Sequence, residues 1–180
     1  CGSLARPWSG DVFRFAVPRW ATRSHLLTGQ GVMRAGGRWH TVGLCRAVYA
    51  SLEPETALAE SLAHFRRFGV PIRDAMLRTL NAVAVQLHRV LDITNGLVRR
   101  RLAISISRIL AEEWWIRQAD DEESLTQCIG RHSFESDFEN LIVPSAARSG
   151  GRGIIWFPQN LESRSRLEVV NPGELPDFPI

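Results

Sequence analysis

A ten-residue alternation, AVAVQLHRVL at residues 82–91, constrains the fold of this chain more than any other segment. Val83, Val85 and Leu87 alternate with Ala and Gln, and this two-residue period is typical of a β-strand. Shorter apolar runs of the kind that build a core sheet predict further strands. These runs are residues 11–17, 45–50, 140–143, 153–157 and 167–170.

The segments between these runs predict helices and loops. A helix is expected after Ser51 as its N-cap, with Pro54 in its first turn, and it should end near Phe68, where Gly69 and Pro71 follow. The remaining expected segments are a long loop over 22–37, a turn over 92–96, a helical stretch over 97–118 broken near Ser105, a solvated acidic turn over 120–123, a helix over 125–129 and an extended tail over 171–180.

Strands and helices therefore follow one another without the regular strand–helix–strand order of a parallel sheet. We expect an α+β, or mixed α/β, fold with a central mixed sheet and a helical insertion. The chain has 180 residues and no linker-like segment, which predicts a single domain over residues 1–180.

The composition favours a globular protein with a small positive charge. Its 22 basic residues are all Arg and outnumber 19 acidic ones, giving a net charge of +3. This charge fits an anionic ligand or an acidic partner and does not by itself indicate nucleic acid. The planar fork of Arg matches phosphate oxygens, although a GC-rich coding sequence explains the same bias.

Cysteines and histidines give no sign of a metal or a disulfide framework. Cys1, Cys45 and Cys128 lack CxxC spacing, which favours a reducing compartment and a cytoplasmic protein. The five histidines show no metal-ligand spacing, so we expect no metal. No segment approaches the roughly 20 apolar residues of a membrane span, and we expect no membrane association.

Arg38, Tyr49 and Glu60 follow one another at an equal spacing of eleven. Arg38 follows two glycines and could bind a phosphate through two N–H groups, or it could be a surface residue on a hairpin turn. Tyr49 could stack on a ligand ring or pack in the core. Glu60 falls on the polar side of its helix, where periodicity predicts a solvated carboxylate. The apolar side of that helix is expected to carry Leu58, Leu62 and Phe65.

Ser145 follows a proline at the end of a predicted strand, in the stretch VPSAAR. No GxSxG motif surrounds it, and no His or Asp lies at a recognisable spacing, which argues against an acyl-transfer nucleophile. Its hydroxyl could hydrogen-bond a ligand or orient a carboxylate. A turn in which the hydroxyl bonds its own backbone explains the residue equally well.

Six short motifs are FRF with Arg14, GGRW with Arg38, VYAS with Tyr49, ETALAE with Glu60, LTQCIG with Gln127 and Gly130, and VPSAAR with Ser145. In this order they resemble the RES domain family, which is named for its Arg, Glu and Ser. The resemblance covers about residues 12–172. The family commonly has Asn where this chain has His40, and the segment 92–118 looks longer than in compact members.

The resemblance implies a fold similar to that of ADP-ribosyltransferases and diphtheria-type toxins. It also implies the toxin of a bacterial Xre–RES toxin–antitoxin pair, which consumes NAD⁺ by hydrolysis or by phosphorolysis. NAD⁺ would then be a substrate, with inorganic phosphate as a candidate co-substrate, and no cofactor is expected. The cognate antitoxin is expected to contain a helix-turn-helix domain and to block NAD⁺ entry.

The resemblance also implies roles for individual residues. Glu60 would stabilise the cation that develops on the ribose as nicotinamide leaves. Arg38, together with Arg14, would hold the pyrophosphate. Tyr49 would pack against the nicotinamide or the ribose, and Ser145 would orient Glu60 or hydrogen-bond the substrate.

Two alternative functions stay open. A protein ADP-ribosyltransferase would use the same residues and transfer ADP-ribose to a macromolecule. A basic nucleic-acid-binding module is a different class, supported by the mild positive charge alone, and a steep loss of affinity with salt would be its signature. We expect no direct nucleic-acid binding by this chain.

Overall fold

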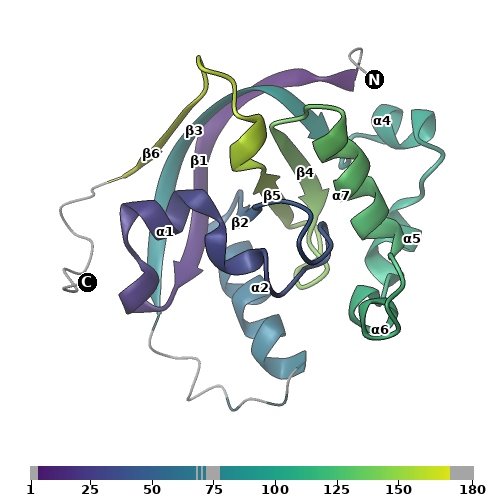
Figure 1. The fold of residues 1–180 in the computed structure, drawn as a ribbon, viewed down its shortest axis with the longest axis horizontal. Coiled ribbons are helices and arrows are strands. Elements are labelled where there is room, and N and C mark those ends of the chain that lie inside the picture. The colour runs from purple at the N-terminus through teal and green to yellow at the C-terminus, as the bar shows by residue number, and fades with distance from the viewer. Residues whose placement is uncertain (1–3, 68, 70, 72–77, 171–180) are drawn as a thin grey trace.

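The computed structural model describes residues 4–67, 69, 71 and 78–170 of the chain. Its centre is one six-stranded sheet in the order β1-β2-β5-β4-β3-β6 (Figure 1). The strands are β1 (Arg6–Ala16), β2 (Val48–Ser51), β3 (Thr79–Asp92), β4 (Asn140–Pro144), β5 (Arg152–Trp156) and β6 (Arg166–Val169).

Strand β3, which contains the alternating segment, organises the sheet. It pairs antiparallel with β1 and β6 and parallel with β4. Strand β1 also reaches β2, where Phe13 lies opposite Ser51. Because β2 pairs with β5 and β5 with β4, the pairings form a closed circuit through β1, β2, β5, β4 and β3. The central mixed sheet predicted from the sequence is confirmed.

Several helices surround this sheet. In Figure 1, α4, α5, α6 and α7 lie together on the right of the sheet, and α2 lies below it. Among the described residues, none of the helices combines the length and apolar character of a membrane span. The helices are α1 (Arg23–Thr28), α2 (Pro54–Arg67), α4 (Gly96–Arg101), α5 (Ile106–Ala111), α6 (Trp114–Ala119) and α7 (Leu125–Glu135), with short 3-10 turns at Pro18–Trp20, Gln30–Val32 and Pro158–Asn160.

Alternating strand residues form two hydrophobic cores on opposite faces of the sheet. Val83 and Val85 of β3 pack in the first core, as their alternation predicted. The second core joins the strands to the helices, because it contains Ile109 of α5 and Ile129 of α7. Tyr49 of β2 packs against this second core. The residues around Tyr49 and the inserted helices therefore share one face of the sheet.

Helix α2 begins at Pro54 as predicted, but two expectations about it are wrong. Ser51 is not the N-cap, because it is the last residue of β2 and pairs with Gly153. Leu58 does not belong to a buried stripe, because it is 45% exposed. The buried side of the helix instead carries the small residues Thr56 and Ala57, which allow the helix to approach the sheet closely. The expected end at Phe68 lies outside the described residues.

The predicted loop over 22–37 is wrong, because it contains α1. Thr22 caps this helix by accepting a hydrogen bond from the His25 backbone, and Gly29 ends it with φ of 65°. The helical stretch 97–118 forms three short helices and not two; the first break follows Leu102, and Ala103 has φ of 53°. The expected tail over 171–180 lies outside the described residues.

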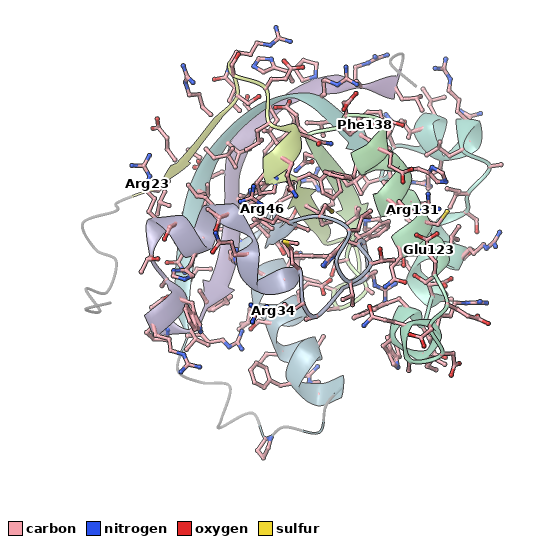
Figure 2. All side chains as sticks on the ribbon, in the orientation of Figure 1. Arg23, Arg34, Arg46, Glu123, Arg131 and Phe138 are labelled. Atoms are coloured by element: carbon pink, nitrogen blue, oxygen red, sulfur yellow. The ribbon has the colours of Figure 1, made fainter. Side chains whose placement is uncertain are left out.

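The acidic turn over 120–123 is exposed, as predicted. It also anchors α7, because Glu123 forms an ion pair with Arg131 at 2.8 Å, and Figure 2 shows the two labelled side chains next to each other. The expected helix over 125–129 extends to Glu135. It starts with a capping box in which the Ser124 and Gln127 side chains bond each other's backbone.

Candidate active site

Glu60 and Ser145 meet, although 85 positions separate them in the sequence. The Ser145 hydroxyl donates to Glu60 Oε1 across 2.6 Å. The same Oγ accepts hydrogen bonds from the backbone N–H groups of Ala147 and Arg148, each at 3.1 Å. Because both N–H groups point at the oxygen, its single proton is directed toward the carboxylate. The backbone turn and the oriented carboxylate, considered as alternatives for Ser145, are both present.

The two residues come from elements that meet at one end of the sheet. Ser145 follows the last residue of β4 and is 6% exposed, whereas Glu60 lies on α2 and its side chain is exposed. The solvated carboxylate expected from helical periodicity is thus confirmed, and it also has a fixed partner. One carboxylate oxygen is held from the protein side, and the group stays accessible from solvent.

Tyr49 lies in a hydrogen-bonded chain with His40. Its hydroxyl accepts from the Trp39 N–H at 3.0 Å and lies 2.8 Å from His40 Nδ1. The other ring nitrogen, Nε2, is 3.1 Å from the Val32 carbonyl and therefore carries the proton. Burial lowers the pKa of His40, although the bond to Val32 opposes this, and the ring is neutral. Tyr49 consequently donates its proton to His40 Nδ1.

Charges at the site act on the Tyr49 hydroxyl. Burial raises the pKa of Tyr49 above its usual range, and the Trp39 N–H lowers it. The Arg38 guanidinium lowers this pKa and the Glu60 carboxylate raises it, so both charges lie close enough to affect the hydroxyl. Arg38 precedes Trp39, whose N–H bonds the Tyr49 hydroxyl, and the effect of Glu60 on the Tyr49 pKa indicates that this carboxylate lies nearby.

Arg38 is presented by a turn that requires glycine. Gly36 has φ of 65°, and a Cβ at Gly37 would lie 2.7 Å from the Tyr49 hydroxyl oxygen. Arg38 itself is half-buried, and its Nη1 donates to the Ile109 carbonyl at 3.0 Å. Helix α5, part of the inserted helical segment, therefore fixes the direction of the guanidinium.

Helix α7 also contacts this turn. Gln127 Nε2 donates to the Gly37 carbonyl at 3.2 Å and to Gln118 Oε1 at 3.0 Å. A Cβ at Gly130 would overlap the carbonyl oxygen of Trp39, so the helix touches the backbone of the turn directly. The LTQCIG stretch supports the turn that carries Arg38.

Arg14 lies away from this neighbourhood. It lies two residues from both Val12 and Ala16 and so shares their face of β1. Val12 and Ala16 pack in the first core, whereas Tyr49 packs against the second. Its Nη1 donates to the Leu26 carbonyl at 3.0 Å, and burial lowers its pKa to about 10. The structure does not bring Arg14 to Tyr49, and its role in binding pyrophosphate stays a prediction.

Sequence reasoning missed three contributors to the site. His40 departs from the family's usual Asn, and nothing in the sequence marks it as the partner of Tyr49. Ile109 acts through its backbone carbonyl, and such contacts leave no signal in the side chains. Arg148 donates through Nη1 to Thr56 at 3.2 Å. The sequence does contain a signal for Thr56, the partner of Arg148. Thr56 precedes Glu60 by four residues, which places both on one face of α2.

The described residues contain no group of three His, Cys, Asp or Glu side chains that could hold a metal ion. Cys45 and Cys128 are free thiols. Burial raises the pKa of Cys45 to about 11, so this thiol stays protonated at neutral pH.

Known proteins resemble this chain over most of its length. The NAD(+) phosphorylase MbcT of Mycobacterium tuberculosis is 24% identical over 171 residues, which cover 93% of this chain and 79% of that protein. MbcT of Mycobacterium bovis gives the same values. The crystal structure of the M. tuberculosis MbcT–MbcA toxin–antitoxin complex matches with a TM-score of 0.71 at 17% identity, over 93% of this chain and 84% of that one.

The structural match shows that the two proteins share a fold. A family model, the RES domain, matches residues 11–178, which is nearly the whole chain. Five of the six motifs that suggested this family contribute residues around Tyr49 and Glu60, and FRF with Arg14 is the exception. This chain belongs to the RES domain family.

Proposed function

We propose that this chain is the toxin of a toxin–antitoxin pair and that it cleaves NAD⁺ between nicotinamide and ribose. The names of its relatives support this proposal, since MbcT is an NAD(+) phosphorylase and its solved complex is a toxin–antitoxin complex. The observation that carries it is the 2.6 Å hydrogen bond from Ser145 to Glu60. The Glu60 carboxylate and the Arg38 guanidinium also act on the pKa of Tyr49, in opposite directions.

Glu60 acts on the sugar in this proposal. As nicotinamide leaves, positive charge develops on the ribose, and a nearby carboxylate stabilises that charge electrostatically. Ser145 holds Oε1, which leaves the second oxygen to face the ribose. Nicotinamide departs as a neutral pyridine, because the electron pair of the broken bond neutralises its ring nitrogen, so the reaction needs no strong general acid.

Arg38 and Tyr49 hold the rest of the substrate. A guanidinium carries five N–H donors, so the bond from Arg38 to Ile109 does not preclude binding of the pyrophosphate. The Tyr49 hydroxyl donates its hydrogen bond to His40 and is therefore not available to the substrate. In this proposal the aromatic ring of Tyr49 contacts the nicotinamide or the ribose. Arg14 donates to a carbonyl of α1 on the face of the sheet opposite Tyr49, so we assign it a secondary role in binding the pyrophosphate.

The proposal includes a partner and a location. An antitoxin with a helix-turn-helix domain would cover Glu60 and prevent NAD⁺ from entering. NAD⁺ is a substrate here, no further cofactor is required, and the protein acts in the cytoplasm. Coexpression with the product of the neighbouring gene should then restore cellular NAD⁺ and growth.

The test is turnover of NAD⁺ by the purified chain, freed of any bound partner. Nicotinamide release is measured with and without inorganic phosphate, and the sugar product is identified by mass. Phosphorolysis gives ADP-ribose 1″-phosphate, hydrolysis gives ADP-ribose, and transfer to a protein leaves ADP-ribose on a macromolecule. Failure to release nicotinamide under either condition would refute the proposed function.

A further inference from the structure

We infer that Arg148 binds the inorganic phosphate that accepts the ADP-ribosyl group, at a subsite on α2 next to Glu60. This inference rests on the proposed function and assigns its second substrate to a residue. The evidence lies in the loop of residues 145–151, which contacts the same face of α2 at two successive turns.

The first contact lies at Thr56, in the first turn of α2. Arg148 Nη1 donates to Thr56 Oγ1 at 3.2 Å. Gly151 packs on the same hydroxyl so closely that an added Cβ would lie 2.6 Å from it. Thr56 is fully buried and donates to Glu53 at 2.8 Å. This end of the loop is therefore fixed against the helix.

The second contact lies one helical turn later. Ser145 donates to Glu60, and the backbone N–H of Arg148 donates to Ser145. Residues four apart on a helix are neighbours at about 6 Å, so Thr56 and Glu60 lie side by side. The Arg148 guanidinium, bonded to Thr56, is thus held one turn away from the carboxylate that acts on the ribose.

Of the two arginines at this end of the loop, Arg148 is the one whose charge is available to an incoming anion. Arg152 is the other arginine at this end of the loop, and it is committed to Glu53 through a 3.1 Å ion pair. Arg148 is exposed and forms no ion pair with an acidic residue in the part of the chain that the structure describes. Its guanidinium matches phosphate oxygens in shape and charge.

The chemistry of phosphorolysis requires such a cation. Phosphate must approach ribose C1 beside the Glu60 carboxylate, and the repulsion between these two anions has to be offset. The bond from C1 to the nicotinamide nitrogen breaks, and its electron pair neutralises the pyridinium. A negatively charged oxygen of hydrogen phosphate forms the new bond, so the nucleophile needs no base.

Arg148→Gln tests the inference without removing the backbone N–H that Ser145 accepts. We expect the KM for inorganic phosphate to rise at least about tenfold, with the KM for NAD⁺ within about twofold of wild type. The product should shift from ADP-ribose 1″-phosphate toward ADP-ribose. Arg148→Lys should fall between the two, because it keeps the charge and loses the planar fork. Arg66→Gln, which changes an exposed arginine of α2, is the matched control and should behave as wild type.

An unchanged KM for phosphate in Arg148→Gln would overturn the inference, and so would a rise in the KM for NAD⁺ alone. The inference would also be overturned if the wild type released nicotinamide at a rate independent of the phosphate concentration. The proposed cleavage of NAD⁺ would still stand in that case.

Phosphate binding is also measured without turnover, as the rise in thermal midpoint on adding phosphate at constant ionic strength. If wild type releases no nicotinamide but gains stability from phosphate through Arg148, the subsite stands and the proposed reaction is wrong. An equal gain in wild type and Arg148→Gln would refute the subsite.

Discussion

The hydroxyl of Ser145 and the carboxylate of Glu60 share a 2.6 Å hydrogen bond, and two backbone N–H groups on the serine oxygen set its direction. A strand end and a helix thereby fix one oxygen of an exposed carboxylate. The bond joins two residues that lie 85 positions apart in the sequence.

Ser145→Ala should lower kcat and leave the KM for NAD⁺ nearly unchanged. The substitution removes a hydrogen bond to a charged group, which contributes about 1.5–3 kcal/mol when it is well formed. Because Glu60 is exposed, we expect the lower end of this range, a loss of about tenfold. Steady-state release of nicotinamide measures both constants. A kcat equal to that of wild type would show that Ser145 does not position Glu60.

Tyr49→Phe and Tyr49→Ala separate the hydroxyl from the ring. The Phe variant leaves the Trp39 N–H and His40 Nδ1 without their partner, and each unpaired buried group costs about 1–3 kcal/mol. We expect the Phe variant to have a lower free energy of unfolding in urea and to keep most of its kcat, since the ring remains. The Ala variant should lose both stability and kcat. Equal losses of kcat in the two variants would assign the function to the hydroxyl.

Stability at mildly acidic pH should depend on His40. Burial lowers its pKa in the folded protein, whereas an unfolded chain protonates His near pH 6.5. The unfolded state therefore binds more protons just below about pH 6.5, and stability is lost as the pH falls from there toward the folded-state pKa. Urea unfolding at about pH 7.5 and about pH 5.5 measures this loss. His40→Asn should lose less stability than wild type, and an identical loss would contradict the assignment.

Gly130→Ala should disable the site from a distance. Its methyl group would overlap the Trp39 carbonyl oxygen and displace the turn that carries Arg38. We expect a rise of about tenfold or more in the KM for NAD⁺, because this displaces Arg38, which we propose holds the pyrophosphate. Gly96→Ala is the control, because its Cβ would meet nothing closer than 3.8 Å. A Gly130→Ala variant with wild-type kinetics would mean that α7 does not position the turn.

The sequence predicted those features that depend on local pattern. The alternation of Val83, Val85 and Leu87 located the long strand β3, and Pro54 located the start of α2. Helix α1 was missed although Thr22 and Gly29 are ordinary capping residues, because six residues with one buried side chain, Leu26, give no period to detect.

The arrangement of the site depends on contacts that no local pattern encodes. Periodicity placed Glu60 in solvent, which is correct, but its bond to Ser145 forms only when α2 meets the end of β4. Arg38 is oriented by a backbone carbonyl of α5, and any residue at position 109 would supply that oxygen. Motif order indicated which residues matter, and the tertiary structure decided which of them meet.

The most direct measurement of the central claim is nicotinamide release from NAD⁺ by Glu60→Gln. This variant keeps a side-chain oxygen for Ser145 and removes the negative charge. Glu55→Gln, an exposed acid on the same helix, is the matched control, and thermal unfolding checks that each variant is folded. We predict a loss of about 100-fold or more in kcat for Glu60→Gln and wild-type activity for Glu55→Gln. A folded Glu60→Gln variant that releases nicotinamide at the wild-type rate would contradict the account.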